Sequence, residues 1–88
     1  MMLPVLVLAG QRDQMNAWAE ENDIPLEHLR FVHTGGDLVG VYGYRVTYVG
    51  EYFTNPMAGF VYDSVARRRL EPLDQSEVKA WIDEQLKS

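Results

Sequence analysis

The stretch VLVLAGQRDQMNAWAEEN, residues 5–22, decides the fold of this chain. It opens with Val5 to Ala9, which are apolar at every position and do not alternate with polar residues. A strand of that kind is covered on both faces, which is typical of a parallel sheet. Gly10 then permits a tight turn before a helical pattern begins. The stretch therefore predicts a central parallel strand that leads directly into a helix.

The helix that follows is predicted from about Gln11 to Asn22. Its apolar side consists of Met15, Trp18 and Ala19, which recur at the spacing of one helical face. The helix ends before Ile24-Pro25, because the residue before a proline is driven out of the helical region.

Two more strands are predicted, at Leu29 to His33 and at Tyr44 to Val49. Both mix polar with apolar residues, so each is interpreted as an edge strand beside the first, which gives the order 2-1-3. The connection between them, Thr34 to Gly43, is just long enough for a parallel return with one short helical turn. In the alternative interpretation, Val39 to Tyr42 pairs with Tyr44 to Val49 as an antiparallel hairpin.

Two further helices are predicted in the second half of the chain. The first begins at Thr54-Asn55-Pro56, an N-cap followed by proline, and ends before Glu71-Pro72. Arg67 to Arg69 fall in its last turn, where cations oppose the negative end of the helix dipole. The second helix begins at Asp74, with Glu77 as its capping-box partner. The residues expected to be buried are Met57, Phe60, Val61 and Val65 of the first helix and Val78, Trp81, Ile82 and Leu86 of the second.

Together these elements predict an α/β fold in the order β-α-β-β-α-α, with a small three-stranded parallel sheet. Residues 1–88 are expected to form a single domain. Right-handed crossovers would place the first helix on one face of the sheet and the later helices largely on the other. The pattern is that of a Rossmann-like half-domain, half of a doubly wound nucleotide-binding fold.

Composition restricts the classes of function. The formal net charge of −5 is a poor match to a nucleic acid backbone, so nucleic-acid binding is not expected. The absence of cysteine removes disulfides and thiolate metal sites and fits a reducing compartment. The longest apolar run, Val5 to Ala9, is too short to span a membrane, and no basic region precedes it as in a signal peptide. A cytoplasmic protein is expected.

In open parallel sheets, a ligand binds beyond the carboxyl ends of the strands where the strand order reverses, here between the first and third strands. The candidate ligand-binding residues follow the three strands and are Gly10, Gln11, Arg12, His33, Thr34, Glu51, Tyr52, Thr54 and Asn55. Gly10 and Arg12 favour an anion at the start of the first helix. A single glycine does not make a dinucleotide fingerprint, however, and no phosphate-loop pattern is present. A bare strand-to-helix turn is the simpler interpretation.

Catalytic and metal sites receive little support from the sequence. A hydrolase would use His33 as its acid or base with Glu51 across the sheet edge, but a structural histidine is the simpler interpretation. His28 and His33 lack the spacing of metal ligands. No catalytic residue, metal site or cofactor is therefore predicted, and we expect a protein that is not an enzyme.

Aromatic residues crowd the second half of the chain between Tyr42 and Tyr62. A small domain cannot easily bury all of them, and tyrosine is favoured at protein interfaces. The predicted interface residues are Tyr42, Tyr44, Tyr62, Arg67 and Arg68, with self-association and a protein partner as the expected modes of binding. Core packing of the rings and dipole compensation by the arginines are the alternatives.

Two segments carry a family resemblance: VLVLAGQRDQMNAWAEENDIP and LRFVHTGGDLVGVYGYRVTYVGEY. Their pattern resembles short Rossmann-like accessory proteins of phages that infect actinobacteria, over about residues 3–70. The resemblance implies a small α/β protein made in the bacterial host cytoplasm and implies no catalytic residue. The leading hypothesis is a non-enzymatic interaction protein, and the alternative is a module that binds a nucleotide or another phosphate ligand at the sheet edge.

Overall fold

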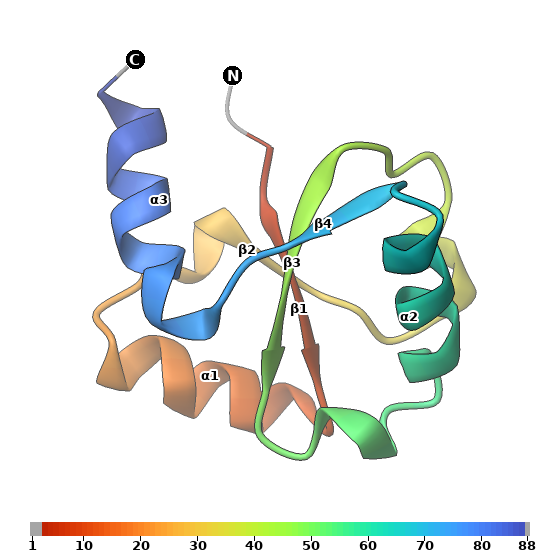
Figure 1. Ribbon diagram of the computed structural model, residues 1–88. Helices are drawn as coiled ribbons and strands as arrows, with labels where there is room; N and C mark the ends of the chain where they lie inside the picture. The colour runs from red at the N-terminus through yellow and green to blue at the C-terminus, as the bar shows by residue number, and fades with distance from the viewer. Residues whose placement is uncertain (1–2, 88) are drawn as a thin grey trace.

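The computed structural model describes residues 3–87 of the chain as a mixed α/β structure (Figure 1). The helices and strands are β1 (Val5–Ala9), α1 (Arg12–Glu21), β2 (Leu29–Phe31), β3 (Tyr44–Val49), α2 (Ala58–Ala66), β4 (Leu70–Pro72) and α3 (Val78–Leu86). Short 3-10 turns lie at Leu26–His28, Gly35–Leu38, Tyr52–Thr54 and Gln75–Glu77.

The four strands form one parallel sheet in the order β2-β1-β3-β4. The prediction of three strands is wrong, because Leu70–Pro72 pairs with the start of β3 and extends the sheet order by one position. Glu71-Pro72 therefore belongs to a strand and does not simply terminate a helix. The sequence does not reveal this strand, because three residues at a sheet edge show too little periodicity to be recognised. As a consequence β3 is an inner strand, while β2 remains at an edge.

The sheet has a core on each face. On the first face, Val5, Val7 and Ala9 of β1 pack with the apolar sides of α1 and α3. On the second face, Leu6 and Leu8 pack with α2 and with the segment that joins β2 to β3. All five β1 residues are fully buried, as expected for a strand covered on both sides. Figure 1 shows α2 on the opposite side of the sheet from α1 and α3.

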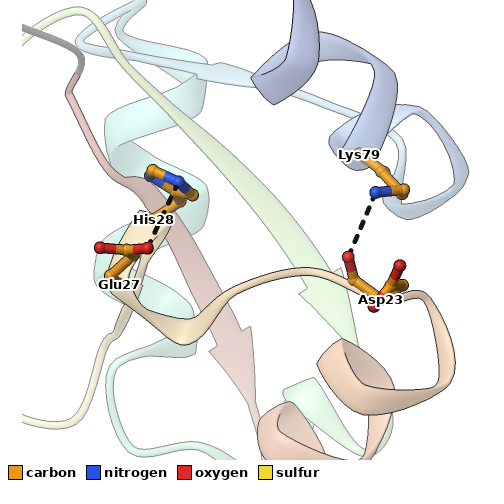
Figure 2. Close-up of polar contacts among 4 residues, drawn as sticks. All are labelled: Asp23, Glu27, His28 and Lys79. Carbon is orange, nitrogen blue, oxygen red and sulfur yellow. Dashed lines mark hydrogen bonds and ion pairs between the residues drawn. The ribbon is translucent and has the colours of Figure 1, made fainter. Parts of the chain in front are cut away.

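The expectation that both later helices cover the second face is wrong for α3. Its buried residues Val78 and Ile82 belong to the same core as α1. β4 ends at the far edge of the sheet, and the chain then crosses back to the first face. Lys79 of α3 donates a hydrogen bond to the backbone carbonyl of Asp23, 3.2 Å away, which ties α3 to the loop after α1 (Figure 2).

The connection from β2 to β3 is a parallel crossover, which excludes the antiparallel hairpin. It crosses β1 on the second face, where Val32, Leu38 and Val41 pack on the core. Gly43 has a φ of 78°, and its N–H group donates to the Arg69 carbonyl at 2.7 Å. Glycine permits this left-handed turn into β3 without strain.

The arginine run follows α2 instead of forming its last turn. Arg68 has a φ of 61°, and its N–H group donates to the Val65 carbonyl. The Arg69 N–H group donates to the Ser64 carbonyl at 2.8 Å. These two bonds are the closing pattern of a helix whose next residue is left-handed. The backbone at Arg68 therefore ends α2 and turns the chain toward β4.

Candidate functional site

The carboxyl ends of β1 and β3, where a ligand was expected, are joined by a side chain of the protein. Gln14, in the first turn of α1, accepts hydrogen bonds through Oε1 from the N–H groups of Gly10 (3.0 Å) and Glu51 (3.1 Å). These are donors that an anion would otherwise use. A Cβ atom at Gly10 would lie 2.8 Å from the Glu51 carbonyl, so only glycine fits. The strand-reversal crevice is thus closed by Gln14.

The carboxyl ends of β1 and β2 are joined by Asn55, a buried residue before α2. Its Nδ2 group donates to the carbonyls of Ala9 and Val32, each at 2.8 Å. Its Oδ1 atom accepts from the Met57 N–H group at 2.7 Å. Asn55 therefore fixes the start of α2 against the end of the sheet. Both N–H donors of this amide and one of the two lone pairs on its oxygen are therefore used within the protein.

An open hollow of about 290 Å³ lies at the ends of β1 and β2, on the face covered by α1. It is lined by Gly10, Gln11, Arg12, Phe31 and His33. The Arg12 guanidinium lies over the Phe31 ring, 5.2 Å from its centroid. The His33 ring is stacked beside Phe31 with a centroid distance of 5.7 Å. A cation, an imidazole and an aromatic ring therefore share one concave surface.

The side chains of Arg12 and Gln11 in this hollow are available to a ligand. Within residues 3–87, Arg12 forms no salt bridge, and Gln11 makes no side-chain capping bond to α1. The loop that carries His33 is held by Asp37, whose Oδ2 atom accepts from the backbone N–H groups of Thr34 and His33, both at 2.8 Å. The N–H of Thr34, followed by that of His33, holds the pKa of Asp37 below its ordinary value.

The structure gathers four of the predicted ligand-binding residues, Gly10, Gln11, Arg12 and His33, around this hollow. The lining does not include Thr34, Glu51, Tyr52, Thr54 or Asn55. Glu51 and Thr54 belong to the β3–α2 turn, where the Thr54 hydroxyl donates to the Glu51 carbonyl at 2.7 Å. Sequence reasoning missed Gln14 and Phe31 as parts of this edge. No motif identifies either residue, because each acts through its position in the folded sheet.

A cluster of aromatic rings lies at the carboxyl end of β3 and on the side of α2. It consists of Tyr48, Tyr52, Phe53 and Tyr62, and is referred to below as the ring cluster. Neighbouring ring centroids are 5.2 to 6.5 Å apart. Burial, followed by the nearby Tyr62 and Tyr52, raises the pKa of Tyr48. Phe53 and Tyr62 keep 66% and 41% of their surface exposed, so the cluster has a half-buried base and an exposed aromatic rim.

The other predicted interface residues lie elsewhere. Tyr42 is exposed and Tyr44 is half-buried against the core, and both lie at the start of β3. Tyr44 and Tyr48 are four positions apart along β3, a distance of about 13 Å. Arg67 is exposed and pairs with Asp63 of α2 at 3.0 Å, so part of its charge is used within the chain.

His28 and His33 are not brought together as a metal site. His28 lies beside Glu27, with 4.0 Å between Nε2 and Oε1 (Figure 2). Within residues 3–87, no group of three or more acidic or histidine side chains is arranged to hold a metal ion. In the same part of the chain, no helix has the length and apolar character needed to cross a membrane.

Comparison of the chain with family models, curated proteins and solved structures found no match.

Proposed function

We propose that this protein is a non-enzymatic interaction module that binds another protein through the ring cluster. The observation that carries the proposal is the exposed rim of that cluster. Phe53 leaves two thirds of its surface in solvent although it lies just after β3 and packs against Tyr52. Aromatic side chains provide much of the energy at protein interfaces, because they bury a large area at small entropic cost.

The geometry around the ring cluster suits this function. Tyr48 and Tyr52 are half-buried and hold the two outer rings in place, so a partner would meet a preorganised surface. Their hydroxyl groups add polar contacts at the edge of an apolar area. Preorganised side chains lose little conformational entropy on binding, which favours affinity.

Site-specific photo-crosslinking tests the proposal. A photoreactive phenylalanine analogue replaces Phe53 in cells that produce the protein, and the same analogue replaces Leu86 of α3 as the matched exposed control. We expect a discrete adduct from position 53, its loss when Tyr62→Ser is added, and no such adduct from position 86. Equal adducts from both positions, or none from position 53, would contradict the proposal.

A second candidate function is the binding of a small phosphate or nucleotide ligand in the hollow of Arg12, Phe31 and His33. The observation that favours it is a guanidinium group in a concave site with no acidic partner among residues 3–87. Arginine matches phosphate geometry through paired N–H donors. The presence of helices on both faces of the parallel sheet also supports a relation to half of a doubly wound fold.

Thermal unfolding with inorganic phosphate, AMP or ATP tests this second candidate. Ligand at ten times its dissociation constant adds about 1.4 kcal/mol to the free energy of unfolding. Arg12→Gln should abolish the shift, whereas Arg69→Gln, at an exposed arginine outside the hollow, should preserve it. The absence of any shift at millimolar ligand would eliminate the candidate.

A further inference from the structure

The outward side of α2 carries a second apolar surface, separate from the ring cluster. An open hollow of about 330 Å³ is lined by Pro56, Gly59, Phe60 and Asp63, all of which are exposed. Phe60 was expected in the core, yet 64% of its surface is exposed. That expectation is wrong because the buried side of α2 passes through Ala58 and Val61 instead.

These four residues have the spacing of a helix-packing hole. Pro56 lies in the turn that leads into α2, and the other three residues lie in α2 itself. Together they occupy positions i, i+3, i+4 and i+7, a spacing that outlines one diamond on a helix surface. In knobs-into-holes packing, a side chain of a facing helix inserts into four residues arranged in this way. Gly59 leaves one corner of the diamond without a side chain, and a Cβ atom built there meets nothing within 4 Å. The hollow is therefore shaped to receive one large side chain from another helix.

The same diamond also presents a large side chain. Phe60 projects from it as an exposed apolar group next to the open position at Gly59. A two-fold dimer requires one patch that complements itself, because both copies contribute the same residues. A knob and a hole at adjacent positions of one helix meet that requirement.

We propose that α2 packs antiparallel against α2 of a second copy of this chain, with each Phe60 inserted over the Gly59 of the other copy. A two-fold axis near these residues places Asp63 of one copy opposite Pro56 and the first turn of α2 in the other. There the carboxylate, which pairs with Arg67 within its own copy at 3.0 Å, also faces the positive end of a helix dipole. A parallel arrangement would instead bring the two Asp63–Arg67 pairs together and leave neither carboxylate at a helix start.

Hydrogen bonding at the start of α2 agrees with this arrangement. Asn55 accepts from the N–H groups of Met57 and Ala58. Within residues 3–87, no acceptor serves the N–H groups of Gly59 or Phe60. Asp63 of the second copy would approach this first turn as an acceptor. The acidic helices α1 and α3 lie on the opposite face of the sheet, so the negative charge of the two copies is kept away from the contact.

Sedimentation equilibrium tests the dimer, with an expected mass of twice the 10.1 kDa chain. Gly59→Leu fills the hole and Phe60→Ala removes the knob, and each should raise the dimer dissociation constant at least tenfold. Both positions are exposed, so the variants should keep the circular dichroism spectrum of the parent protein. Leu26→Ala and Leu86→Ala remove exposed leucines elsewhere and should leave the dimer unchanged. A parent protein that stays monomeric at millimolar concentration would overturn the inference.

Disulfide trapping tests the antiparallel orientation, and the chain has no cysteine of its own to interfere. Pro56→Cys mixed with Asp63→Cys should give a linked dimer, whereas neither variant alone should link efficiently. Efficient linkage of each variant alone would overturn the antiparallel arrangement. This inference goes beyond the proposed function, because the contact between the two copies of α2 uses residues outside the ring cluster. The two can fail separately, because a monomer that still gives a specific adduct with another protein at position 53 retains the proposed function alone.

Discussion

The side-chain oxygen of Gln14 lies 3.0 Å from the Gly10 nitrogen and accepts its hydrogen bond at the end of the central strand. The same oxygen accepts from the Glu51 N–H group, so one amide links β1, α1 and the turn after β3. In many α/β proteins this position is where a bound anion meets backbone donors. Here the side-chain oxygen of Gln14 is the acceptor, so these backbone donors hold β1, α1 and the turn after β3 together.

Gln14→Met keeps most of the side-chain volume but removes the acceptor. Two backbone N–H groups then lose their partner, which should lower the free energy of unfolding by about 1–3 kcal/mol. Gln14→Glu is the matched control, because a carboxylate oxygen accepts the same two bonds. Urea denaturation measures both variants. If Gln14→Met unfolds at the same urea concentration as the parent protein, the two hydrogen bonds to Gln14 contribute nothing to stability.

Asn55→Ala should be strongly destabilising. It removes two donors from the buried carbonyls of Ala9 and Val32 and one acceptor from the start of α2. We expect a loss of about 2–4 kcal/mol, measured by thermal and urea unfolding. Thr54→Ala, which removes only an exposed hydroxyl bond, is the neighbouring control and should cost about 0.5–1 kcal/mol. Equal losses in the two variants would show that Asn55 does not hold the strands together.

Thr47→Val should stabilise the protein. The Thr47 side chain is fully buried in β3, and no group within residues 3–87 forms a hydrogen bond with its hydroxyl group. Valine keeps the shape and removes the cost of desolvating that hydroxyl, which is about 1–3 kcal/mol. Calorimetric unfolding measures the gain, and Thr47→Ser, which keeps the hydroxyl and loses a methyl group, should be destabilising. A less stable Thr47→Val variant would mean that the hydroxyl is satisfied in solution.

Asp37 should make the free energy of unfolding depend on pH in the acid range. The backbone N–H groups of Thr34 and His33 hold its pKa in the folded protein below the ordinary value of 3.8. The contribution of the Asp37 carboxylate to stability is therefore present above pH 3.8. It is lost as the pH falls through the pKa that this group has in the folded protein. Asp37→Ala should lose stability near pH 7 and approach the parent protein at the acid end of a denaturation series. Asp83→Ala, at an exposed carboxylate of α3, is the control. A difference between parent and Asp37→Ala that does not change with pH would contradict this account.

The sequence predicts the centre of this fold better than its edges. Val5 to Ala9 is apolar throughout, which is the pattern of a strand buried on both faces, and all five residues are buried. Tyr44–Val49 alternates, and its two sets of side chains do face opposite cores. Such periodic signals are local, so they can be recognised without knowing the rest of the structure.

The remaining features depend on contacts between distant segments. β4 has three residues and becomes a strand only because β3 offers it a partner. Gln14 and Glu51 are 37 residues apart, and no local pattern reveals that they meet. The same holds for the hollow, where Arg12 and Phe31 come together from different elements. Sequence reasoning therefore finds the edge of the sheet where a site would lie but not which side chains already fill it.

The two outer strands of the sheet have a consequence for how this protein assembles. β2 and β4 each have only three residues, and β4 ends in Pro72, which has no N–H group to donate. Such edges give an incoming strand too few hydrogen bonds to join the sheet. Growth into fibrils by strand addition is therefore blocked at both ends. The proposed contact between two copies of α2 would instead give a closed pair that cannot propagate.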